Sequence, residues 1–204
     1  GVAKHILADL DKLSRTDATA FQAFWLQFGA VVKEGLCDAV EHRDDILKIA
    51  RFHSTHNSDM TSLDSYVERM KDGQDCIYYM SGENVDHLRH SPQIEGFKKR
   101  GLDVLLFHDT IDDFWLPVVM NFKGKPFVSV TKGAIDLSKF PVADKDPATP
   151  EVVSHTRTAL LAFLKTHLAD SVSDVRVSDR LTDSPVCLVA SDTEADLNVA
   201  RILK

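Results

Sequence analysis

The amino-acid sequence predicts an α/β fold of the α+β kind, in which a helical segment precedes a small, mainly parallel three-stranded αβα sheet. Three observations predict it. Apolar residues recur at steps of three and four through residues 1–72, which is the period of an amphipathic helix. Between residues 73 and 140, short apolar runs alternate with helical stretches. A charged, proline-rich stretch then precedes a further helix and two strand-like runs, which predict a second, small α+β unit.

Residues 1–72 are predicted to be helical. They open with two apolar stripes, and Thr16 and Asp17 lie between these as a stop signal and an N-cap. A third helix is predicted at residues 43–52. A fourth opens at Thr61, where Asp64 follows at the spacing of a capping box, although aspartate replaces the usual glutamate or glutamine.

Residues 73–140 are predicted to form the sheet. Strands and helices are expected to alternate in the order 76–80, 92–100, 104–107, 111–121 and 127–130, with strands first, third and last. This order predicts parallel strands joined by right-handed crossovers. Gly101 follows Lys99 and Arg100, which is typical of a helix C-cap that leads into the second strand.

A composition break at residues 138–150 divides the chain. Pro141, Pro147 and Pro150 stand there among charged residues, which predicts a linker at 141–150 between a block at 1–140 and a block at 151–204. The second block is predicted to hold a helix at 150–169, strands at 172–178 and 186–190, and a last helix at 194–204. The apolar positions of that last helix have no obvious partner within the chain.

The composition argues against several classes of protein. A formal net charge of −7 and the lack of any long basic run argue against nucleic-acid binding. No apolar run reaches the length of a membrane span, and the first residues do not resemble a secretory signal. Cys37, Cys76 and Cys187 lack metal or redox spacing, which predicts reduced, mostly buried thiols in a cytoplasmic protein. The chain begins without Met, within an apparent helical pattern, so we expect a piece of a longer protein.

The residues that could carry chemistry leave two interpretations open. Asp109, Asp112 and Asp113 follow the second predicted strand, where three carboxylates could hold Mg²⁺. The same residues suit a helix start, with Asp109 or Thr110 as the N-cap and the other two acids near the positive end of the helix dipole. No nucleotide loop, HExxH pair or GxSxG turn occurs, and the histidine pairs 53/56 and 87/90 lack a third ligand, so no catalytic or metal site is predicted with them.

An apolar feature lies on the helix predicted at 111–121. Phe114 and Trp115 are consecutive, so their side chains point about 100° apart and do not easily share one core. Either one of them is exposed, as aromatic residues are at binding surfaces, or the neighbouring helices bury both.

The order of motifs resembles that of the Hsp90 family of molecular chaperones. The segments that carry the resemblance to its middle domain are FWLQFGAVVKEG (24–35), LKIARFHST (47–55), TSLDSYVERMK (61–71), QDCIYYMSGE (74–83), GLDVLL (101–106) and GKPFVSV (124–130). SDRLTDSP (178–185) resembles a motif of the carboxy-terminal domain. These seven segments follow one another between residues 24 and 185, and the short linker resembles that of bacterial members.

The resemblance implies a homodimeric, ATP-driven chaperone of three domains. Residues 1–140 would be the latter part of the middle domain and 151–204 the beginning of the carboxy-terminal domain. The resemblance places ATP and Mg²⁺ in an amino-terminal domain, the arginine that reaches the γ-phosphate upstream of Gly1, and the dimer helices downstream of Lys204. The segment by itself is therefore expected neither to bind a cofactor, nor to hydrolyse ATP, nor to dimerise as the parent does.

The resemblance also implies a place for client proteins. Bacterial relatives have an acidic and aromatic patch on the helix after the second strand, which falls on Asp113 and Phe114, with Trp115 beside them. The match is partial, since Asp-Phe-Trp replaces Glu-Trp and Pro117 replaces a nearby polar residue. The expected function is contact with unfolded or partly folded clients and coupling between domains. The alternatives are a small α/β enzyme that uses the carboxylates with Mg²⁺ for phosphoryl transfer or hydrolysis, and a structural module.

Overall fold

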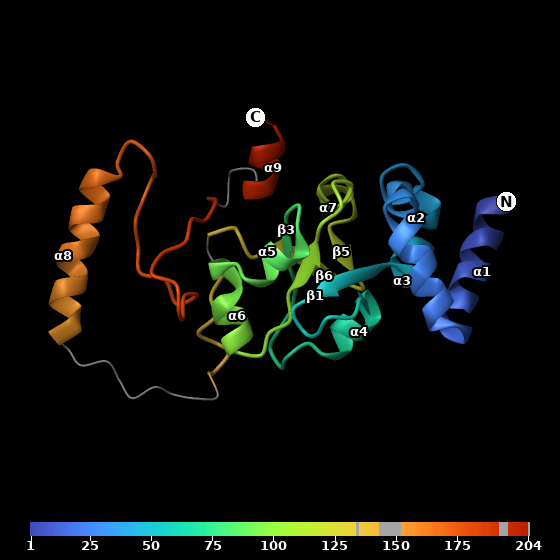
Figure 1. The fold of residues 1–204 in the computed structure, drawn as a ribbon, viewed down its shortest axis with the longest axis horizontal. Coiled ribbons are helices and arrows are strands. Elements are labelled where there is room, and N and C mark those ends of the chain that lie inside the picture. The colour runs from blue at the N-terminus through green and yellow to red at the C-terminus, as the bar shows by residue number, and fades with distance from the viewer. Residues whose placement is uncertain (134, 143–151, 192–195, 204) are drawn as a thin grey trace.

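The computed structural model describes residues 1–133, 135–142, 152–191 and 196–203. Helices and strands alternate through most of this chain (Figure 1). The α-helices are α1 (Val2–Thr16), α2 (Ala18–Asp38), α3 (Arg43–Ile49), α4 (Leu63–Glu68), α5 (Val85–Arg89), α6 (Glu95–Lys99), α7 (Asp112–Val119), α8 (Val152–His167) and α9 (Leu197–Ile202). The strands are β1 (Arg51–Ser54), β2 (Thr61–Ser62), β3 (Ile77–Ser81), β4 (Leu105–Phe107), β5 (Asn121–Phe122) and β6 (Lys125–Ser129), and short 3₁₀ turns cover Val40–His42 and Pro92–Ile94.

The sheet has the order β2-β1-β4-β3-β6-β5. Its centre is parallel, as predicted: β3 lies between β4 and β6, with Tyr79 opposite Leu105 on one side and Ser129 on the other. The prediction of only three strands was wrong, because β1, β2 and β5 add antiparallel pairs at both edges. These added strands are two to four residues long, which is too short to show a clear period in the sequence.

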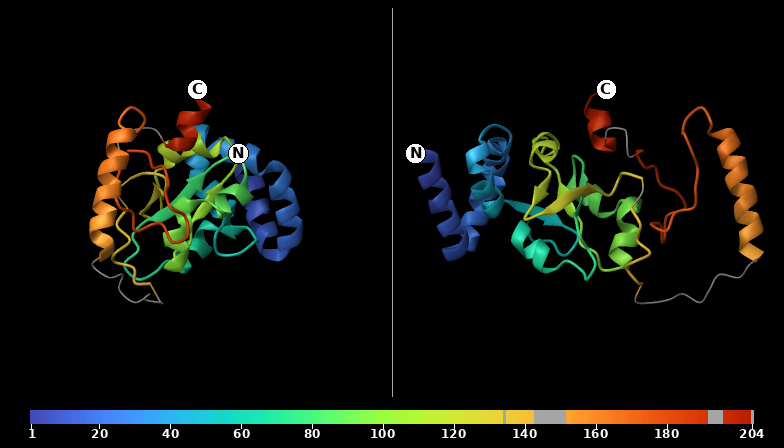
Figure 2. Two further views of the ribbon diagram at one scale, coloured as in Figure 1. Left: turned by 60° about the vertical axis from the view of Figure 1, so that its left-hand side comes forward. Right: turned by 180° about the vertical axis from the view of Figure 1, so that it is seen from behind.

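Each face of the sheet carries its own core, because successive residues of a strand point to opposite faces. On one face Ile77, Leu105 and Phe107 pack with residues of α2, α3 and α7. On the other face Tyr78 and Leu106 pack with residues of α5 and α6. The αβα layering that the sequence predicts is therefore confirmed, and Figure 2 shows the helices on both sides of the strands.

The helical segment is only partly as predicted. Asp17 caps α2 by accepting a hydrogen bond from the Ala20 amide at 3.0 Å, so the predicted break between the first two helices is confirmed. The helix predicted at 43–52 ends at Ile49, because Ala50 is extended (ψ 142°) and the chain enters β1. The fourth helix is capped by Ser62 rather than Thr61, which lies in β2. The four helices predicted within residues 1–72 are therefore present, but β1 and β2 lie between the last two.

A tight hairpin joins β5 to β6. Its two central residues, Lys123 and Gly124, both have positive φ (50° and 76°), as a type I′ turn requires. The turn lets the chain return directly from α7 into β6. The loop after α6 also turns through a glycine, since Gly101 has φ 66°, as its predicted capping role requires.

The carboxy-terminal block departs most from expectation. Helix α8 is present and stands apart from the sheet (Figures 1 and 2). The strands predicted at 172–178 and 186–190 were wrong: the described residues there form a single bridge, between Lys132 and Ala190. A strand needs a neighbour to receive its backbone hydrogen bonds, and Val177 and Val186 instead lie exposed. The linker beyond residue 142 and residues 194, 195 and 204 of the last predicted helix lie outside the described residues.

Residues 180–184 nevertheless hold tightly to α6, in a contact that we call the clasp. The Glu95 carboxylate accepts hydrogen bonds from the amides of Thr182 (2.8 Å), Asp183 (3.0 Å) and Ser184 (3.2 Å). These bonds, with that from the Ser184 hydroxyl first among them, lower the pKa of Glu95 from 4.5 to about 2. Arg180 is buried and donates to the carbonyl oxygens of residues 130, 132 and 133.

The clasp depends on a glycine, which gives a first prediction. A Cβ at Gly96 would lie 2.7 Å from the Cα atom of Arg180, and backbone cannot move aside as a flexible side chain can. Gly96→Ala should therefore weaken docking by about 1–3 kcal/mol. Because Arg180 is only 3% exposed, the rate of tryptic cleavage after Arg180 measures undocking and should rise about tenfold. Lys99→Ala, an exposed change on the same helix, serves as the control, and an unchanged rate in Gly96→Ala would contradict the clasp.

Candidate functional site

Helix α7 carries the residues that the sequence singles out. It begins at Asp112 after Ile111, whose side chain makes no capping hydrogen bond. The prediction of Asp109 or Thr110 as the N-cap was therefore wrong. Asp112 and Asp113 do occupy the first turn, where a negative charge is favourable. The Asp112 carboxylate also reaches back to the Asp109 amide at 3.3 Å, so an acid within the helix binds a backbone donor that precedes it.

A buried charge cluster fixes α7 to α2. The Lys33 ammonium lies 2.6 Å from Asp112 and 2.7 Å from Asp109. Lys33 and Asp112 are almost fully enclosed, at 2% and 1% exposed. The indole of Trp115 also donates to Asp112, at 2.8 Å. Since a buried charge is stable only when it is paired and hydrogen-bonded, these contacts determine how α7 lies on the sheet.

The same cluster bears on the magnesium alternative. Burial raises the pKa of the Asp112 carboxyl, and the Lys33 ammonium opposes that effect. The ammonium already occupies the space between Asp109 and Asp112 that a cation would need. Within the described part of the chain, no group of three or more histidine, cysteine, aspartate or glutamate side chains is placed to hold a metal ion. No observation therefore favours the enzyme alternative.

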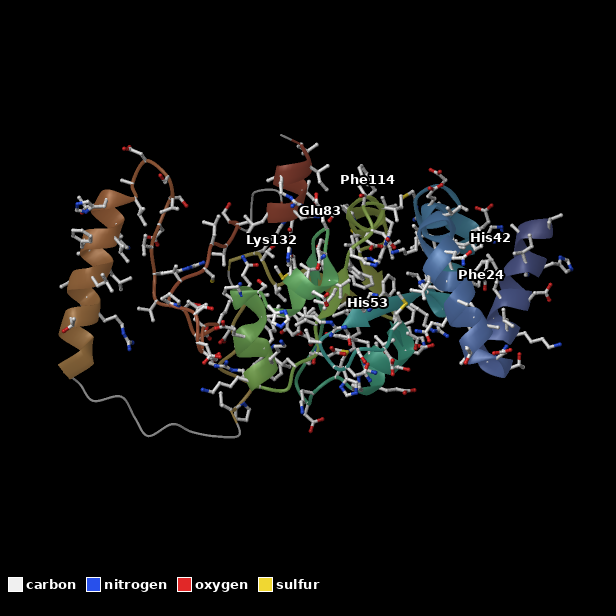
Figure 3. The ribbon with its side chains drawn as sticks, viewed as in Figure 1. Phe24, His42, His53, Glu83, Phe114 and Lys132 are labelled. Carbon is white, nitrogen blue, oxygen red and sulfur yellow. The ribbon has the colours of Figure 1, made fainter. Side chains whose placement is uncertain are left out.

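The two consecutive aromatic residues of α7 differ in their exposure to solvent. Phe114 is 58% exposed, whereas Trp115 is fully buried. The Trp115 ring packs against Phe52, Phe107 and Phe127. In Figure 3, Phe114 projects from the outer side of α7. The interpretation that one of the two is exposed is confirmed, and the exposed one is Phe114.

Phe114 belongs to a small apolar surface that we call the α7 face. Its other large apolar members are Val118 (43% exposed) and Met120 (63% exposed). Met120 closes the helix at φ 60°, an unusual conformation for a residue other than glycine. Asp113 borders this face and is partly buried, and the Asn198 amide of α9 donates to its carboxylate at 2.7 Å. Burial raises the pKa of Asp113, and the hydrogen bond from Asn198 lowers it.

The other candidate groups do not converge on a site. His53 lies beside His108 rather than joining His56, with the ring centroids 5.3 Å apart, and burial lowers the pKa of His53. All three cysteines are unbridged, but only Cys76 is buried, so the prediction of mostly buried thiols was wrong. No helix among the described residues is long and apolar enough to span a bilayer.

Sequence reasoning missed Lys33, although a signal for it existed. The buried positions of α2 are Phe21, Trp25, Gly29, Lys33 and Leu36, a stripe at helical spacing in which one residue is charged. A lysine on the apolar stripe of a helix indicates a buried partner, which here comes from 79 residues further along the chain. Glu95 and Asn198 gave no such local signal, because both lie on helices of five or six residues, too short to show an apolar stripe.

Comparison with known proteins decides the family. The model of the family described as Hsp90 protein matches residues 2–204. This chain belongs to the Hsp90 family. Among its relatives is the chaperone protein HtpG of Nitrobacter hamburgensis, 46% identical over 202 residues, which are 99% of this chain and 32% of the relative. HtpG of Roseobacter denitrificans is 45% identical over 204 residues, which are 100% of this chain and 33% of the relative.

A solved structure supports the same placement within the family. The middle domain of a Plasmodium falciparum heat shock protein superposes with a TM-score of 0.60 and 32% sequence identity. The match covers 65% of this chain and 56% of that domain. The Hsp90-family chain described here spans about a third of the length of the curated relatives it matches. The resemblance of its motifs to Hsp90 is thereby confirmed.

Proposed function

We propose that this chain is the client-contact and interdomain-coupling part of an Hsp90-type chaperone, and that the α7 face is where it holds clients. The observation that carries the proposal is the exposure of Phe114 on a helix whose inner side is fixed by the Lys33 cluster. A rigid support keeps an exposed apolar side chain available instead of letting it collapse into the core.

The chemistry of the α7 face suits unfolded or partly folded proteins. Phe114, Val118 and Met120 offer apolar surface, and removing such surface from water is worth roughly 25 cal/mol per Å². Methionine and aromatic side chains adapt to varied partners. Asp113 adds a carboxylate for a basic residue of the client. Trp115 has no exposed surface, so its part in client binding is to support the helix that presents Phe114.

The proposal extends to a whole protein of the relatives' length, of which this chain would be about a third. We infer an ATP-driven homodimer, with ATP and Mg²⁺ held by its amino-terminal domain, that acts in the cytoplasm. The names of the relatives, which are chaperones three times as long as this chain, support this inference. The three unbridged thiols suit a reducing compartment. The clasp supplies the physical link through which the carboxy-terminal block would follow movements of the sheet.

The test replaces Phe114 in the whole protein. Phe114→Ser should raise the Kd for an unfolded client about tenfold, because burying a phenylalanine side chain contributes about 1.5–3 kcal/mol. Binding is measured by fluorescence anisotropy with a synthetic peptide rich in arginine and leucine. Val40→Ser is the matched control, since Val40 is similarly exposed (65% against 58%) but lies in the 3₁₀ turn Val40–His42 rather than on α7. Equal affinity of the two variants would refute the site.

A further inference from the structure

Helix α9 lies where a client would have to reach Asp113. Figure 1 shows it above β3 and beside α7. Its Asn198 amide donates to the Oδ2 atom of Asp113 at 2.7 Å, and burial already restricts access to that carboxylate. A basic side chain of a client cannot form its best contact with Asp113 while Asn198 holds this oxygen atom.

The contacts that attach α9 to the sheet are mainly polar. The Asp196 carboxylate accepts hydrogen bonds from the hydroxyls of Ser129 and Thr131, the latter at 2.8 Å, where β6 ends. The ion pair of Arg201 with Glu83, at 3.0 Å, joins two side chains that are each more than half exposed and contributes little. No residue of α9 is buried, and Ile202 is 44% exposed. Leu197, Val199 and Ala200 are only partly buried, so the apolar burial that fixes most helices is weak here.

Two like charges weaken this contact further. Asn198 donates to both carboxylates, through its backbone N–H to Asp196 at 3.1 Å and through its side-chain amide to Asp113 at 2.7 Å. Asp196 is buried and Asp113 is partly buried. Burial raises the pKa of Asp113 most, and the charge of Asp196 raises it as well. Carboxylates that repel each other across a docking contact lower the free energy needed to separate its two sides.

Residues 180–184 and Ala190, which lie earlier in the chain than α9, are held much more firmly. Three backbone amides of the clasp converge on Glu95, and Arg180 is buried against three carbonyl oxygens. The Ala190 amide also donates to the Thr131 carbonyl at 2.8 Å. Release of α9 would therefore leave residues 180–190 in place.

We propose that α9 is a gate on the α7 face. It competes with the client for Asp113, and it opens while the clasp stays closed. This rests on the proposed function, since it gives the regulation of the same site. By linkage, a client that binds Asp113 favours release of α9, and a condition that releases α9 strengthens client binding by the same factor. The carboxy-terminal block thereby senses whether the α7 face is occupied.

The experiment uses Asn198→Ala in the whole protein and begins without any client. Hydrogen exchange of the α9 amides should become at least about threefold faster, while exchange in α6, next to the clasp, stays unchanged. Leu203→Ala is the control at the C-cap of the same helix and should leave exchange nearly as it was, because Leu203 is 78% exposed. Unchanged exchange of α9 in Asn198→Ala would overturn the gate.

The second readout is affinity for the arginine- and leucine-rich peptide. Asn198→Ala should bind it at least about threefold more tightly than the unaltered protein, because Asp113 loses the donor that Asn198 supplies. Faster exchange without tighter binding would also overturn the gate, since α9 would then not compete for Asp113. The two proposals fail separately: exchange is measured without client, whereas Phe114→Ser tests the α7 face whatever α9 does.

Discussion

Lys33→Met is expected to lower the free energy of unfolding by about 3–5 kcal/mol, because it leaves buried carboxylates without their positive partner. Asp112 is 1% exposed and lies 2.6 Å from the ammonium that the change removes. The Trp115 indole and the Asp109 amide remain as donors to Asp112, but neutral hydrogen-bond donors cannot replace the lost charge. Urea unfolding followed by tryptophan fluorescence measures the loss, since Trp25 of α2 and Trp115 of α7 both lie in the core.

The control and the pH dependence sharpen this test. Lys48→Met removes an exposed lysine that pairs with Asp11, and it should cost less than about 1 kcal/mol. Burial already raises the pKa of Asp112, so without Lys33 its charged form destabilises the fold at neutral pH. The loss should therefore shrink as the pH falls toward that raised pKa, where the acid becomes neutral. A loss below 1 kcal/mol at neutral pH would show that the cluster does not hold α7.

Trp115→Ala is expected to destabilise the chain by about 3–5 kcal/mol, because it opens a cavity and removes a donor from buried Asp112. Trp115 is among the largest of the fully buried side chains, and three phenylalanine rings surround it. Thermal unfolding monitored by circular dichroism measures the effect as a lower Tm.

The neighbouring residue supplies the comparison for that prediction. Phe114→Ala should change stability by no more than about 0.5 kcal/mol, because Phe114 is 58% exposed and leaves no cavity. The order should reverse for client affinity. For each kcal/mol of stability lost, Phe114→Ala should weaken client binding more than Trp115→Ala does. Similar losses of stability in the two variants would contradict the orientation of α7.

These two residues show how α7 serves two purposes at once. Its inner side, with Asp112 and Trp115, is bound to α2 and the sheet, and its outer side, with Phe114, is left to the solvent. An exposed apolar group is costly to keep unless the element that carries it is anchored elsewhere. The Lys33 cluster supplies that anchor through groups that have no contact with a client.

Much of the fold could be predicted because its signals are local. The spacing of apolar residues predicts α2, and Asp17 marks its start, since capping needs only the next three residues. The parallel centre of the sheet follows from alternation of strand and helix. The family follows from the order of seven motifs. The strands predicted at 172–178 and 186–190 failed because an alternating pattern supplies no neighbouring strand to pair with.

The sequence by itself therefore determined most of the helices, the central strands, the family and the short stretch in which the candidate site lies. Only the tertiary structure decided that Phe114 faces outward and Trp115 inward, since a step of 100° leaves open which direction is the core. It also paired Lys33 with Asp112 and Asn198 with Asp113, 79 and 85 residues apart. Local periodicity fixes which elements form, whereas the packing of distant elements fixes which side chains remain free to bind.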